Sequence, residues 1–131
     1  MTEGAKELFM YQGLSERIIT CALAVHSELG PGLLESIYEE AMTMEMGEAG
    51  LSFQRQVELP VQYKGVPLNG VYRLDMVVEN AIVLELKSAM QMHPVFDAQL
   101  LTYMKLGGWR VGLVLNFGMP TMREGLRRLV L

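Results

Sequence analysis

Two short apolar runs, residues 70–78 and 81–88, constrain the fold more than any other part of the chain. Both are rich in valine, leucine and isoleucine and are short enough to be strands rather than helices. Glu79 and Asn80 separate them, as a tight turn between neighbouring strands requires. The runs therefore predict an antiparallel pair buried in a sheet, and "FQRQVELPVQYKG" before them predicts a third strand of the same meander.

The rest of the sequence alternates helical and strand patterns around this meander. Ser15 is the predicted N-cap of a first helix, which Gly30 and Pro31 end. We expect Gly47 and Gly50 to end the second helix. The remaining predictions are a helix over 95–107, a buried strand over 109–118, and a short basic helix over 121–131 with Thr121 as its cap. This order predicts an α/β fold with a central mixed β-sheet flanked by helices.

Composition restricts the class of protein. A chain of 131 residues, half of them hydrophobic and a fifth charged, predicts a single domain over residues 1–131. The sequence contains neither an export signal nor an apolar run long enough to span a membrane, so we expect a cytoplasmic protein without membrane contact. Cys21, the sole cysteine, is expected in the core. A formal net charge of −4 argues against general binding to polyanions.

Three charged residues, Asp75, Glu85 and Lys87, interrupt strands that would otherwise be apolar. Side chains alternate between faces along a strand, so Glu85 and Lys87 should share a face. On the preceding strand, Asp75 is predicted to lie opposite the face that carries Leu74 and Met76. Antiparallel pairing would then bring Asp75 alongside Glu85.

Two carboxylates that converge among apolar residues repel each other and are costly to ionise unless a cation lies between them. Mg²⁺ or Mn²⁺ suits such oxygen ligands and also accepts phosphate oxygens. Lys87 would then position or deprotonate a metal-bound water, or stabilise charge on a phosphate, which predicts phosphodiester hydrolysis. On spacing alone, a plain salt bridge between Lys87 and Asp75 or Glu85 at an exposed sheet edge is an equally good interpretation.

Further residues make the chain resemble a known family. The segment "GLLESIY", residues 32–38, matches the G-x-x-E-x-x-Y signature of the GxxExxY proteins, a group of the PD-(D/E)xK nuclease superfamily. The order of Glu35, Asp75 and then Glu85-Leu86-Lys87 is similar to the superfamily motif, although residue 74 is Leu where the motif has Pro. Residues 97–105, "DAQLLTYMK", resemble the Q-x-x-x-Y motif of RecB-like nucleases.

The resemblance implies a restriction-endonuclease-like core and assigns roles within it. Asp75, Glu85 and the backbone carbonyl of Leu86 would ligate one or two Mg²⁺ or Mn²⁺ ions, and Glu35 would reach the site directly or through water. Lys87 would organise the attacking water. The remaining two motif residues, Gln99 and Tyr103, would meet the Lys87 edge or a substrate phosphate. The resemblance thus implies a nuclease that cuts DNA or RNA by means of a metal-activated water.

A second hypothesis is a non-catalytic module that binds nucleic acid or protein while keeping the nuclease fold. It is motivated by the net charge of −4, because a nuclease acting alone normally has a basic groove. Such a module would act as a homodimer or with a protein partner. The arginines at 123, 127 and 128 are predicted to form a solvated helical face, with phosphate contact as the alternative. His93 is predicted to cap a helix or lie in a loop, with a minor catalytic role as the alternative because it follows the Lys87 strand.

Overall fold

One five-stranded mixed sheet organises residues 11–131, the part of the chain that the computed structural model describes. The strands follow one another across the sheet in sequence order, and only β3 and β4 run parallel. The parallel pair requires a crossover, and a helix provides it. The strands are β1 (Phe53–Tyr63), β2 (Val66–Val78), β3 (Ile82–Lys87), β4 (Val111–Asn116) and β5 (Leu126–Val130).

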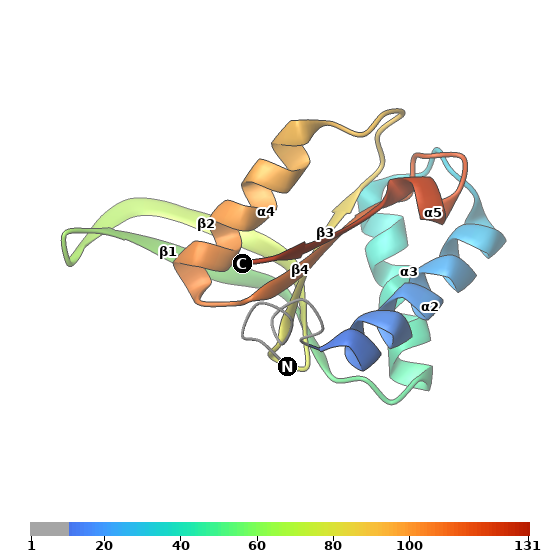
Figure 1. Ribbon diagram of the computed structural model, residues 1–131, viewed down its shortest axis with the longest axis horizontal. Coiled ribbons are helices and arrows are strands. Elements are labelled where there is room, and N and C mark those ends of the chain that lie inside the picture. Colours follow the sequence, from blue (N-terminus) through green and yellow to red (C-terminus); the bar gives the residue numbers. More distant parts are fainter. Residues whose placement is uncertain (1–10) are drawn as a thin grey trace, which may run out of the picture.

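Helices cover both faces of the sheet (Figure 1). Helices α2 (Gln12–Leu29) and α3 (Glu35–Glu48) pack on one face, and the crossover helix α4 (Pro94–Gly107) packs on the other. Each side has its own apolar cluster, because alternate residues of β3 and β4 point to opposite faces. Figure 1 also shows β1 and β2 projecting as a long hairpin beyond the rest of the sheet.

Most predicted elements are present, and the predicted α/β class with a central mixed sheet and flanking helices is confirmed. Glu79 and Asn80 form the turn between β2 and β3 with φ angles of 52° and 51°. Pro94 occupies the start of α4, and Gly108 ends this helix in the left-handed conformation. No helix within residues 11–131 is both long and apolar enough to cross a membrane.

The prediction for the start of α2 is wrong, and the prediction for the end of α3 is right only at Gly50. Helix α2 already begins at Gln12, so Ser15 is not its N-cap but a buried residue whose hydroxyl accepts a hydrogen bond from Arg128 Nε at 3.1 Å. Helix α3 continues through Gly47 to Glu48, so Gly47 does not end it. Gly50 does, as predicted: it adopts the left-handed conformation, and the next N–H, that of Leu51, donates to the carbonyl of Met46 at 2.9 Å.

The prediction of a basic helix at the C-terminus is wrong in its larger part. Thr121 does cap a helix, α5, by accepting a hydrogen bond from the backbone of Glu124, but this helix covers only Met122–Gly125. The chain then forms β5 along the free edge of β4. Every residue of β4 is buried, so its second edge needs backbone partners, and β5 supplies them. Arg127 and Arg128 therefore belong to a strand, not to a solvated helical face.

Candidate active site

Asp75 and Glu85 meet where strands β2 and β3 separate. The backbone pairing of the two strands ends at Met76 and Leu84. Beyond this pair, the Leu86 N–H donates to Oδ2 of Asp75 at 2.8 Å, and the Asp75 N–H faces Oε1 of Glu85 at 3.4 Å. The two side chains thus take the place of backbone partners, and the structure brings together the two carboxylates as the strand pattern predicted.

Asp75 also marks a break in the alternation of β2. Leu74 packs in the cluster beneath α4, whereas Met76 packs in the cluster beneath α2 and α3. The prediction that Leu74 and Met76 share one face is therefore wrong. On β1, Gln56 lies between the residues that pair with Met76 and Leu74, and its φ of 50° is in the left-handed region. The backbone of β1 is thus irregular next to Asp75, whose carboxylate accepts from the backbone of β3.

The environment of the pair disfavours two negative charges. Glu85 is only 5% exposed, and its pKa is raised to about 8, first by burial and then by the charge of Asp75. Burial also raises the pKa of Asp75, against the lowering effect of its hydrogen bond from Leu86. Lys87 lowers both pKa values, but its effect is smaller than that of burial. Near neutral pH the pair therefore favours a bound proton or a cation.

Helix α4 places two of the predicted site residues on the face of Glu85 and Lys87. Lys87 Nζ donates to Oε1 of Gln99 at 3.2 Å and lies 5.0 Å from the centroid of the Phe96 ring. The pKa of Tyr103 is raised by burial and then by the charge of Glu85, so this side chain lies near the carboxylate pair. In the described part of the chain Lys87 forms no ion pair with either carboxylate, so the structure does not contain the simple salt bridge.

The loop before α3 is held by the tyrosine of the GLLESIY segment. The Tyr38 hydroxyl donates to the carbonyl of Gly30 at 2.6 Å and accepts from the Leu33 N–H at 3.1 Å. Its buried ring stacks on Phe117 with 4.5 Å between the centroids. These contacts, together with a φ of 100° at Gly32 that favours glycine, determine where α3 begins.

Glu35 is the first residue of α3 and is exposed. Its charge raises the pKa of Asp75, so it acts on the site from the helix. The Ser88 hydroxyl donates to the carbonyl of Leu33 at 2.5 Å and ties the segment after β3 to the segment that precedes α3. Glu35 thus lies near enough to act on Asp75 through its charge, and within residues 11–131 no hydrogen bond joins it to Asp75 or Glu85.

Glu39, one turn later on α3, is an acidic residue near the pair to which the sequence reasoning gave no role. It is buried, its Oε2 is 2.9 Å from Nη2 of Arg55, and its Oε1 accepts from Gln56 Nε2 at 2.7 Å. Among the acidic residues of α3, Glu39 has the larger effect on the pKa of Asp75. Its i+4 spacing from Glu35 is the one sequence signal that could have pointed to it.

The arginines near the C-terminus and His93 lie outside this cluster. Arg127 Nη2 is 2.9 Å from Oδ2 of Asp97, which links β5 to α4. Arg128, on the face that α2 covers, donates to the hydroxyl of Ser15. His93 takes the backbone position of the α4 N-cap, as predicted, and its ring contacts Phe96 edge-on.

The donor chemistry of the pair fits a hard divalent cation. Asp75 and Glu85 offer two adjacent carboxylates, and burial, followed for Glu85 by the charge of Asp75, raises their pKa values, so a cation between them would stabilise their charged forms. Within residues 11–131 no group of three or more His, Cys, Asp or Glu side chains is arranged to hold a metal. Mg²⁺ does not need such a group, because it keeps several waters and takes one or two carboxylates plus phosphate oxygens.

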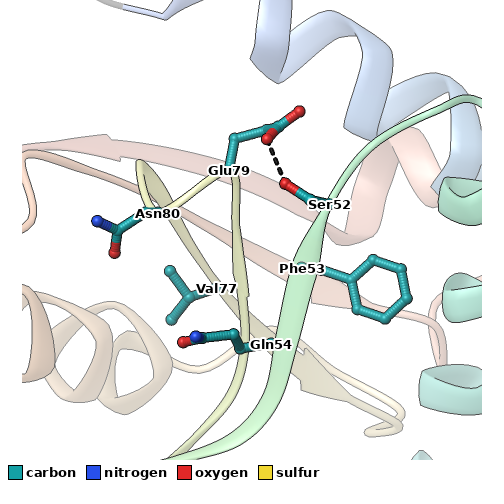
Figure 2. A pocket seen from close by; sticks show the side chains of 6 residues that line it. All are labelled: Ser52, Phe53, Gln54, Val77, Glu79 and Asn80. Atoms are coloured by element: carbon teal, nitrogen blue, oxygen red, sulfur yellow. Dashed lines mark hydrogen bonds between the residues drawn. The ribbon is translucent and has the colours of Figure 1, made fainter.

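A surface pocket at the β2–β3 turn has different chemistry (Figure 2). It has a volume of about 360 Å³, and its single carboxylate, Glu79, is directed toward the hydroxyl of Ser52, to which it is hydrogen-bonded. Its other lining residues are Phe53, Gln54, Val77 and Asn80. With one carboxylate that already has a partner and no cationic side chain, it lacks the features found at Asp75 and Glu85.

With this site described, the chain can be compared with known protein families. A family model for the PD-(D/E)XK nuclease superfamily matches residues 12–129. The chain belongs to this superfamily. Its mixed sheet with flanking helices is the restriction-endonuclease-like fold of PD-(D/E)XK proteins, whose nucleases generally use divalent metal ions. No curated protein and no solved structure gives a significant match.

Proposed function

We propose that this protein is a metal-dependent nuclease that hydrolyses phosphodiester bonds of DNA or RNA at Asp75, Glu85 and Lys87. The observation that carries the proposal is the buried carboxylate pair at the point where β2 and β3 separate, with the pKa of Glu85 raised to about 8. A site that disfavours its own negative charges in this way is suited to a divalent cation. Membership of a nuclease superfamily supports the same reaction class.

Each residue has a distinct role in this proposal. Asp75, Glu85 and the Leu86 carbonyl would hold Mg²⁺ or Mn²⁺, and Glu35 would assist from α3. A bound cation would supply Lewis-acid polarisation of the phosphate and lower the pKa of a water molecule. Lys87, held on the same face by Gln99, would orient the attacking water or neutralise charge on the phosphate.

We also propose that the chain is a GxxExxY protein within the superfamily. The support is structural as well as sequential, since Tyr38 fixes the loop at Gly30 and Leu33 and so determines the position at which α3 presents Glu35. The glycine, the glutamate and the tyrosine of the motif would then serve one purpose, which is to place an acidic residue beside Asp75.

The test is cleavage of single-stranded and duplex DNA and RNA with Mg²⁺ or Mn²⁺. Glu85→Gln and Lys87→Ala should each lower the rate by about 100-fold or more, the usual cost of removing a group that stabilises charge in the transition state. The matched control is Glu58→Gln, which removes an exposed carboxylate of β1 whose partner is Arg73 at 3.5 Å. This control should retain wild-type activity, and circular dichroism should show that all variants are folded.

Two outcomes would count against hydrolysis. One is a wild-type protein that cuts none of the four substrates with either metal. The other is tight binding of nucleic acid without turnover and with no change in the Lys87→Ala variant, which would favour the non-catalytic binding module.

A further inference from the structure

A hollow beside the carboxylate pair is lined by two tyrosines. Tyr72 of β2 and Tyr103 of α4 lie with their ring centroids 5.4 Å apart and their planes tilted by 45°. Ala98, Gln99 and Thr102 complete the lining of this tyrosine hollow, which has a volume of about 270 Å³. Tyr72 is 48% exposed, so an aromatic surface is open to solvent here.

The tyrosine hollow adjoins the candidate active site through two of its lining residues. Gln99 accepts a hydrogen bond from Lys87 Nζ, and the charges of Glu85 and Asp75 both raise the pKa of Tyr103. Since Tyr72 faces Tyr103, the hollow lies on the same side of the sheet as Glu85 and Lys87. A molecule seated in it would be next to any phosphate held at the carboxylate pair.

The chemistry of the lining selects a flat, uncharged group. None of its five residues carries a charge, and the Thr102 hydroxyl donates to the carbonyl of Ala98. A phosphate would therefore find no cation, whereas an aromatic ring would find a ring to stack on and an amide at Gln99 for hydrogen bonding. The volume is just below the roughly 300–1,000 Å³ of pockets that enclose drug-sized ligands, which suits one ring system.

We propose that the tyrosine hollow binds an unpaired nucleobase adjacent to the phosphate that is cut, so that the substrate is single-stranded or frayed nucleic acid. This inference rests on the proposed nuclease function and narrows its substrate class. A base inside a duplex is already stacked on its neighbours and cannot present its face to Tyr72. An unpaired base can, and stacking of bases on aromatic side chains is a general mode of single-strand recognition.

The experiment measures binding separately from cleavage. Fluorescence anisotropy with a labelled single-stranded oligonucleotide, in Ca²⁺ in place of Mg²⁺, gives Kd for the wild type, Tyr72→Ala, Tyr72→Trp and Tyr63→Ala. Tyr63 is a suitable control, because it is 62% exposed on the same hairpin but does not line the hollow. Tyr72→Ala should raise Kd by about fivefold or more, Tyr72→Trp should restore binding, and Tyr63→Ala should leave it unchanged.

A second readout reports stacking itself. In an oligonucleotide that carries 2-aminopurine, binding to the wild type should quench the fluorescence of the base, and Tyr72→Ala should abolish this quenching. The inference is overturned if the wild type binds no single strand, if it binds duplex as tightly as single strand, or if Tyr72→Ala and Tyr63→Ala give the same Kd. Quenching by a wild type that cuts no substrate would uphold the base site and reject the proposed hydrolysis.

Discussion

Glu85 has a pKa of about 8 in the folded protein, far above its ordinary value of 4.5, because burial and the neighbouring Asp75 disfavour its charge. Between these two pH values, the folded chain therefore holds a proton on Glu85 that the unfolded chain has already lost. The unfolded state binds fewer protons in this window, so the free energy of unfolding of the metal-free protein should fall as the pH rises from about 4.5 to about 8. Thermal melts in EDTA across this range measure the effect.

The matched control for this prediction is Glu85→Gln, which keeps the shape of the side chain and removes its titration. The variant should lose less stability than the wild type over the same pH range. Mg²⁺ or Mn²⁺ should raise the Tm of the wild type more at pH 8 than at pH 5, because the cation competes with the proton for the carboxylate. Parallel pH curves for the two proteins would contradict the assignment of this titration to Glu85.

Sequence reasoning found the residues whose position follows from strand periodicity and could not find those that depend on distant contacts. Glu85 and Lys87 share a face in a regular strand, and their placement was predicted correctly. Glu39 is held by Arg55 and Gln56 of β1, and no local pattern encodes that contact. The break at Asp75 was missed for the same reason, since it depends on how two neighbouring strands separate.

At the scale of elements, the change from α5 to β5 is the feature that local sequence did not predict. The spacing of apolar residues in 121–131 favours a helix, but pairing with the free edge of β4 favours a strand. From Leu126 onward the chain forms the strand. Gly125 lies at this change of direction, where a Cβ would be 2.1 Å from the carbonyl oxygen of Asn116. The backbone of β4 and the end of α5 can approach this closely only because residue 125 has no side chain.

Gly125→Ala should therefore lower the free energy of unfolding by about 1–3 kcal/mol, the usual cost of forcing extra atoms into a packed site. Gly47→Ala is the matched control: Gly47 lies inside α3, and a Cβ there would meet no atom within 4 Å. This second change should stabilise the protein by about 0.5–1 kcal/mol, because alanine favours a helix over glycine. Urea unfolding of both variants measures these changes. Equal changes in the free energy of unfolding would show that the close contact at Gly125 does not destabilise the alanine variant.

At the scale of the whole molecule, only one of the two faces of the sheet supports the helix that carries Gln99 and Tyr103. The cluster beneath α4 supports the helix that carries Gln99 and Tyr103, whereas the larger cluster beneath α2 and α3 lies on the opposite face. Strand periodicity predicts that such a sheet has two buried faces. It does not tell which face a given helix covers, because that depends on the direction of the crossover between β3 and β4.

This division predicts that equal losses of packing on the two faces have unequal effects on activity. Leu100 and Met46 are both fully buried, the first beneath α4 and the second in the cluster beneath α2 and α3. Leu100→Ala and Met46→Ala should each lower the free energy of unfolding by about 2–5 kcal/mol. Only Leu100→Ala should also lower kcat at a temperature where both variants are folded, because it loosens the helix turn that holds Gln99 against Lys87. Denaturant unfolding and single-strand cleavage by the same preparations measure both effects, and an equal loss of kcat in the two variants would show that activity follows global stability instead of the position of α4.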